Sequence, residues 1–150
     1  MDHQLKVIHS LDIYILTSTL HESYLFRIDG RDSITRMDAS STGLLTTQRT
    51  LALANIPRRV VQQGGSSYVD SSYVVQITPH GLHLTEYDST LDTFTASGCG
   101  WYLQQQQTSG WDKQEIVAGA INPSQFAAAL SGGAVLLFNL STEGEINLTS

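Results

Sequence analysis

The sequence is built from short apolar segments separated by residues that favour turns, and this pattern constrains the fold more than any other feature. In residues 24–29 every second side chain is apolar (Tyr24, Phe26 and Ile28), so these side chains share one face, as in a half-buried strand. The best helical candidate, residues 125–130, is too short for a stable helix. The pattern therefore predicts an all-β protein.

The expected strands fall into three groups. They lie near residues 12–19, 23–29 and 33–37 in the first group, 50–56, 73–78, 82–87 and 91–95 in the second, and 115–121, 125–130, 134–140 and 145–148 in the third. The first group resembles the same unit with its leading strand missing or unrecognisable. Pro57 is expected to end the strand before it, and residues 58–72 are expected to form a long surface insertion. Residues 57–72 and 98–110 are expected to be mobile because they are rich in Gly, Ser and Gln.

The second and third groups share one layout, an apolar strand, a turn, a second strand, a turn with Gly, and a third strand that becomes polar. Repeated four-stranded antiparallel units are typical of β-propeller blades. We therefore predict WD40-like β-propeller blades, about three of them, in a single domain 1–150 that is an incomplete propeller. The blades are expected at roughly 12–48, 49–100 and 111–150. A β-sandwich is the alternative.

Composition excludes several classes of protein. The 150 residues carry a net charge of -6, whereas domains that grip nucleic acid through its phosphates are usually basic. A single cysteine, Cys99, excludes an internal disulfide and a Cys-rich zinc module. No apolar run approaches the length of a membrane span, and residues 1–10 show no signal-peptide pattern, so an intracellular compartment is expected.

No residue pattern points to an enzyme. His80 and His83 have a metal-like spacing, but no Cys or acid is placed to complete the ligand set. Cys99 has no base near it in sequence, and Asp29 and Asp32 alternate with arginines, which is typical of a solvated turn. The prediction is a non-enzymatic protein with no catalytic residue, no metal and no cofactor.

Four residues are candidate partner contacts. Arg58 and Arg59 form the one double-basic site, and they could meet a phosphate or an acidic partner. Trp101 and Trp111 flank the Gln-rich loop, where packing in the core or between blades is the first interpretation and an exposed aromatic contact is the second.

Several of these segments also resemble a known family. The resemblance lies in GLLT (43–46), TLALANI (50–56), YVVQITPHGLHL (73–84) and the stretch 116–140 with its turns NPSQ (122–125) and SGG (131–133). Together they are similar to the second propeller of the family formed by the large subunit of the damaged-DNA-binding complex, the large subunit of the cleavage and polyadenylation specificity factor, and subunit 3 of splicing factor 3b. The similarity covers about residues 12–145. The insertion at 58–72 and the glutamine tract at 104–107 depart from the family pattern.

The resemblance implies a piece of a longer propeller protein and a role as a protein-interaction scaffold in the nucleus. It implies other protein subunits as partners, in a complex for DNA repair (as a ubiquitin-ligase adaptor) or for pre-mRNA splicing or polyadenylation. Contact with nucleic acid would be indirect, through the complex, and no membrane is involved. The alternative is a small β-sandwich hydrolase or carbohydrate-binding domain, which needs clustered acids or histidines at strand ends that the sequence lacks.

Overall fold

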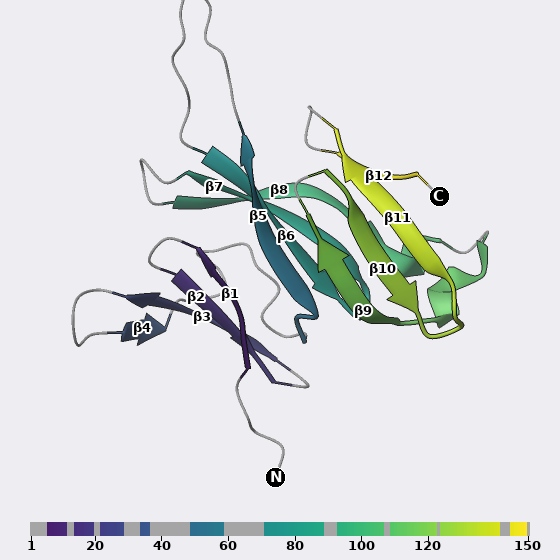
Figure 1. Ribbon diagram of the computed structural model, residues 1–150, viewed down its shortest axis with the longest axis horizontal. Helices are drawn as coiled ribbons and strands as arrows, with labels where there is room; N and C mark the ends of the chain where they lie inside the picture. Colours follow the sequence, from purple (N-terminus) through teal and green to yellow (C-terminus); the bar gives the residue numbers. More distant parts are fainter. Residues whose placement is uncertain are drawn as a thin grey trace, which may run out of the picture.

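Three antiparallel sheets of four strands each form the described part of the chain (Figure 1). The computed structural model describes residues 6–11, 14–19, 22–28, 34–36, 49–58, 71–88, 93–106, 109–122, 124–141 and 145–149. The strands are β1 (Lys6–Leu11), β2 (Tyr14–Ser18), β3 (Ser23–Ile28), β4 (Ile34–Arg36), β5 (Ala52–Arg58), β6 (Ser71–Thr78), β7 (Gly81–Asp88), β8 (Thr93–Tyr102), β9 (Ile116–Ile121), β10 (Phe126–Leu130), β11 (Val135–Leu140) and β12 (Ile146–Leu148). The short 3-10 helices η1 (Leu103–Gln105) and η3 (Trp111–Lys113) lie between the second sheet and the third.

Each sheet is a simple meander, with strand orders β1-β2-β3-β4, β5-β6-β7-β8 and β9-β10-β11-β12. The first strand of the second sheet, β5, contacts both β1 and β9, and Figure 1 shows it between them. Three sheets that stack in series, with their first strands side by side, form the arrangement of propeller blades and not that of a two-layered sandwich. The predicted all-β propeller fold is confirmed.

The apolar core lies between the second and third sheets. Val75 and Ile77 of β6 and Leu84 of β7 are fully buried, as are Phe126 of β10 and Phe138 of β11. These side chains alternate with residues on the opposite face of each strand, so the period of two seen in the sequence places one apolar row against the other sheet. Burial of these rows is the main favourable contribution to the packing of the two sheets.

The first and second sheets meet at a polar junction. The side chain of Gln76 is fully buried and donates from Nε2 to Thr50 Oγ1 at 2.8 Å. Thr50 Oγ1 also bonds Ser23 Oγ, and the Thr50 amide donates to Ser18 Oγ at 3.0 Å. Because each of these groups has a partner, the junction avoids the cost of a buried polar group without a hydrogen bond.

A similar contact recurs between consecutive sheets. The Thr50 amide, just before β5, donates to Ser18 Oγ at the β2–β3 turn. The Ile116 amide, at the start of β9, donates to the carbonyl oxygen of Pro79 in the β6–β7 turn at 2.8 Å. In both cases the start of one sheet is bonded to the corresponding hairpin turn of the sheet before it, so the repeat seen in the sequence is also a structural repeat.

Of the two alternatives for the first group, its leading strand is present but was not recognisable from the sequence. β1 pairs with β2 along its length, with a register shift between Val7 and His9. Its sequence, KVIHSL, mixes polar and apolar residues and is irregular at the shift, so it gives no clean alternation for sequence analysis to find.

The prediction that Pro57 ends its strand is wrong. β5 continues through Pro57, which pairs with Ser72, to Arg58, which pairs with Ser71. β5 is the edge strand of its sheet and has a bonded neighbour, β6, on one side only, so a residue without an amide hydrogen is tolerated there. Residues 59–70, the remainder of the expected insertion, lie outside the described residues.

Part of the predicted loop at residues 98–110 belongs to the sheet. β8 extends to Tyr102 and pairs with β7, where Trp101 lies opposite Leu82. Leu53 and Ile116, in the first strands of the second and third sheets, are both buried. Val117 and Val135, by contrast, are 55% and 60% exposed.

Candidate functional site

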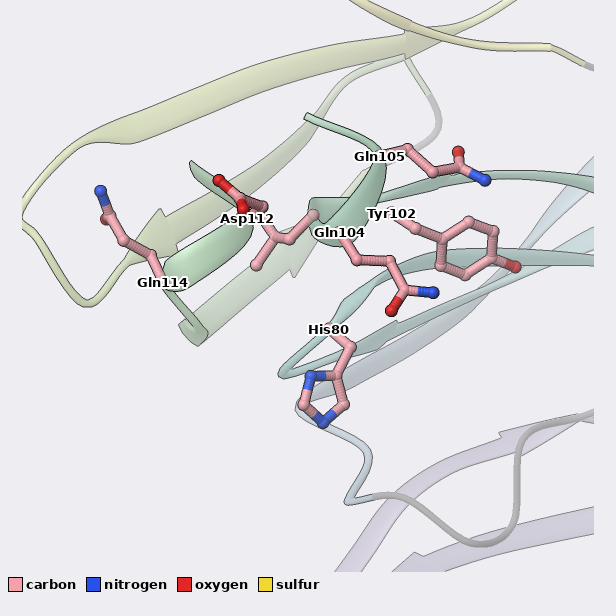
Figure 2. Close-up of a pocket in the computed structure, with 7 residues that line it drawn as sticks. His80, Tyr102, Gln104, Gln105, Asp112 and Gln114 are labelled. Carbon is pink, nitrogen blue, oxygen red and sulfur yellow. The ribbon is translucent and has the colours of Figure 1, made fainter. Parts of the chain in front are cut away.

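A pocket of about 570 Å³ lies where the β6–β7 turn meets the end of β8 and the two 3-10 helices (Figure 2). Its described lining residues are His80, Tyr102, Leu103, Gln104, Gln105, Asp112 and Gln114. The volume is within the range of about 300–1,000 Å³ that is usual for ligand pockets. Loops at the ends of strands are where rigid β scaffolds usually carry their binding residues.

The β6–β7 turn fixes the position of η1. The Leu103 amide donates to the carbonyl oxygen of His80 at 3.0 Å, and the Gln106 amide closes the helical turn onto Leu103 at 2.8 Å. The Leu103 side chain is buried and serves as an apolar anchor. Gln104 and Gln105, the next two residues, are consequently held with their side chains exposed at the pocket.

Tyr102 forms a wall of the pocket because two glycines make room for it. A Cβ added at Gly81 would overlap the carbonyl oxygen of Trp101, and one added at Gly100 would lie 2.7 Å from the Tyr102 hydroxyl oxygen. The Tyr102 hydroxyl also bonds Nδ1 of His83 at 2.7 Å. The ring is therefore fixed at both ends and does not depend on a ligand for its orientation.

Gln114 is held by the third sheet. Its side-chain Oε1 accepts a hydrogen bond of 3.0 Å from the Gly132 amide in the β10–β11 turn. Its own amide donates to the carbonyl oxygen of Trp111 at 3.0 Å and closes η3. A Cβ at position 132 would lie 2.6 Å from Oε1, so glycine is needed for this approach. The pocket is thus built from both the second and the third sheet.

The chemistry of the pocket is dominated by hydrogen-bond acceptors and donors. Gln104, Gln105 and Gln114 each offer a carbonyl oxygen and an amide group, and Asp112 is the one carboxylate among the described lining residues. No Lys or Arg is among those residues. Lys113 and Glu115 are exposed nearby but do not belong to the described lining.

The structure separates the four candidate partner contacts. Trp101 is buried, with its ring 4.8 Å from Phe138 in an edge-on contact and 6.1 Å from Trp111. Trp111 is partly exposed in η3, beside the pocket residue Asp112. Arg58 is the last residue of β5, while Arg59 lies outside the described residues.

The other motifs that sequence analysis considered do not come together as a site. His80 lines the pocket, whereas His83 bonds Tyr102. In the described parts of the chain, no group of three or more His, Cys, Asp or Glu residues could hold a metal ion. Asp29 and Asp32 lie outside those parts, and the side chain of Cys99 is not described. None of the helices that the structure describes is long and apolar enough to cross a membrane.

Sequence analysis did not find the pocket. The glutamine tract at 104–107 departs from the family pattern, and Trp111 is a candidate partner contact. Both lie in segments that line the pocket or adjoin it, but neither predicted a pocket there. Nothing in the sequence connected Gln114 or Tyr102 to His80, because these residues are brought together by hydrogen bonds between turns that are distant in sequence.

The serial sheets and the pocket at their loops define a β-propeller module. The chain belongs to a particular propeller family, since the sequence model described as "RSE1/DDB1/CPSF1 second beta-propeller" matches residues 4–150. A search of the curated proteins found no significant match. The resemblance inferred from the strand and turn segments is therefore confirmed.

Proposed function

We propose that this chain is part of a non-enzymatic scaffold that holds protein subunits together in a nuclear complex that handles nucleic acid. The observation that carries the proposal is the match to the second propeller of the family over nearly the whole chain, on a structure of stacked four-stranded sheets. Propellers present rigid surfaces with variable loops, and such surfaces suit binding to other proteins.

The proposed scaffold includes a further sheet packed on the third one. The outer face of the third sheet carries Ala118, Ala120, Ala127, Ala129, Val135 and Leu137, which are paired with one another across β9, β10 and β11. The corresponding residues of the second sheet, such as Ile77 and Leu82, are fully buried against the third sheet. Because all six of these residues are apolar, we expect another sheet to pack on this face of the third sheet.

The repeat also specifies how the further sheet would sit. Each described junction has a backbone amide at the start of one sheet bonded to the hairpin turn of the previous sheet. We expect the amide at the start of the additional sheet to donate to the turn at residues 131–133. Blades at roughly 12–48, 49–100 and 111–150 would thereby become part of a closed ring of four to eight blades.

The proposed nuclear location rests on the membership of this family, and the expected partners are proteins. The net charge of -6 and a pocket whose described lining has one carboxylate and no Lys or Arg argue against a large phosphate-binding surface on this module. Nucleic acid would accordingly reach the complex through other subunits. The process in which this complex acts is DNA repair, pre-mRNA splicing or polyadenylation.

The test is co-purification of the tagged full-length gene product from nuclear extract, with and without nuclease treatment. A fixed set of protein subunits that survives nuclease treatment is expected, together with nuclear fluorescence of the tagged product. A matched variant, Val75→Asp, places a charge in the core and should lose the subunits, whereas Gln125→Glu on an exposed turn should keep them. A product found outside the nucleus, or a nuclear product without stoichiometric protein partners, would contradict the proposal.

A further inference from the structure

The outer strand of the third sheet, β12, lacks the features that usually keep the edge of a sheet from pairing. Natural edge strands are often interrupted by charged side chains, prolines or bulges. Among the described outer strands, β4 ends in Arg36, and β8 shifts its register against β7. β12 pairs with β11 without a register shift, and its sequence, INL, has neither a charge nor a proline. In the described part of the chain, its other edge has no bonded strand.

The pairing of β12 with β11 determines which backbone groups lie at this open edge. The Thr149 amide donates to the carbonyl oxygen of Leu137 at 2.8 Å, so the ladder continues past the end of the strand. Because alternate residues of an antiparallel ladder bond the same neighbour, Asn147 also faces β11. The N–H and C=O groups of Ile146 and Leu148 therefore point toward the open edge.

The two faces of β12 differ in polarity. Leu148 lies opposite Phe138, and Ile146 lies opposite Leu140, on the side of the sheet that faces the core. Leu148 is 39% exposed at the end of this apolar row. Asn147 is exposed on the other face. A strand added at this edge should therefore carry apolar side chains toward the core side and a polar side chain on the other side.

The β12 strand of a second copy of the chain meets both requirements. In an antiparallel pair centred on Asn147, Ile146 faces Leu148 of the second copy, and Asn147 faces its own equivalent across a two-fold axis. Glu145 faces Thr149 of the second copy, so no like charges meet. We propose that two copies of this chain pair through β12 and join their third sheets into one continuous antiparallel sheet.

The proposed contact is short, so the association is weak and depends on concentration. The outward N–H and C=O groups of Ile146 exchange hydrogen bonds with those of Leu148 in the second copy, and the reverse pair does the same. An interface of this size is typical of a transient association. It uses the edge of the third sheet and not its outer face, which the proposed scaffold covers with a further sheet.

Charges placed at the two-fold axis test the pairing. Asn147→Glu and Asn147→Lys each set like charges opposite one another, whereas a mixture of the two variants sets opposite charges there. Binding is measured by surface plasmon resonance at low salt, with one chain immobilised and the other in solution. We expect the opposite-charge combination to bind at least about tenfold more tightly than either like-charge combination.

Asn139→Glu and Asn139→Lys are the matched controls. Asn139 is exposed and lies opposite Asn147 on the same face, one strand farther from the axis. The control variants should prefer the opposite charge by less than about twofold. A further variant, Leu148→Pro, removes an outward N–H that the sheet itself does not use, so the chain should fold and lose the association.

Equal binding of like and opposite charges at position 147 would overturn the proposal, as would equal preferences at positions 139 and 147. Undiminished association of a folded Leu148→Pro chain would also contradict it. If Leu148→Pro does not fold, the charge variants, which change exposed side chains only, decide the matter. These measurements need no nuclear partner, so their failure leaves the proposed scaffold function unaffected.

Discussion

Individual residues in the core of the second and third sheets differ sharply from those in the turns. Val75 and Phe138 are fully buried, whereas His80 is exposed in a turn. We expect Phe138→Ala and Val75→Ala to lower the free energy of unfolding by roughly 1 to 5 kcal/mol, with Phe138 the larger. His80→Ala should change it by less than about 0.5 kcal/mol. Urea unfolding of the three variants tests this, and equal midpoints would contradict the assignment of the core.

Gly119 allows the second and third sheets to approach closely. A Cβ at this position would lie 2.8 Å from Cδ1 and 2.9 Å from Cγ2 of Ile77. Ile77 is fully buried and has little room to move, so Gly119→Ala should destabilise the protein by about 1–3 kcal/mol through overpacking. Ala120→Ser, on the exposed face of the same strand, is the control and should be nearly neutral. Unchanged stability in Gly119→Ala would mean that the sheets are farther apart.

At the scale of elements, strands dominate and the described helices are single 3-10 turns. The circular dichroism spectrum should therefore show less than about a fifth helix, well below the share in an average globular protein. A strong helical signal would be incompatible with three meander sheets.

The end of β8 and the start of η1 should be protected from solvent exchange. The Leu103 amide donates to the His80 carbonyl oxygen, and its side chain is buried. We expect its amide hydrogen to exchange much more slowly than is usual for an amide in an exposed loop. Fast exchange at this amide would restore the expectation of a mobile loop at residues 98–110.

Sequence patterns located elements well where an apolar row faces a partner sheet. In β7, Leu82 and Leu84 alternate with polar residues and both are buried. The apolar run in β11 conceals an alternation, since Leu136 and Phe138 are buried and Val135 is exposed. β1 was missed because its register shift disrupts alternation, and the extent of β5 was missed because Pro57 is permitted at an edge. The pocket could not be found because its residues meet only through contacts between turns, which leave no periodic signal in the sequence.

At the scale of the whole molecule, the outer face of the third sheet dominates behaviour in solution. Val117 and Val135 are more than half exposed, beside alanines that are also uncovered. We expect the isolated chain to be oligomeric, poorly soluble or bound to a partner at tens of micromolar, because exposed apolar sheet faces associate. Light scattering tests this, and a cooperative monomer would contradict it. Val135→Lys should shift the distribution toward smaller species, whereas Glu145→Gln should not.

The buried hydroxyl of Thr50 has a consequence for assembly. On one side of the second sheet it bonds Gln76 of the neighbouring strand and Ser23 of the first sheet, whereas the face with Ile77 needs an apolar surface. A sheet without a hydroxyl group in the place of Ser23 would leave this buried hydrogen bond unmade, at a cost of about 1–3 kcal/mol. One pair of hydroxyls therefore gives the stack a direction, so that otherwise similar blades join in a single order.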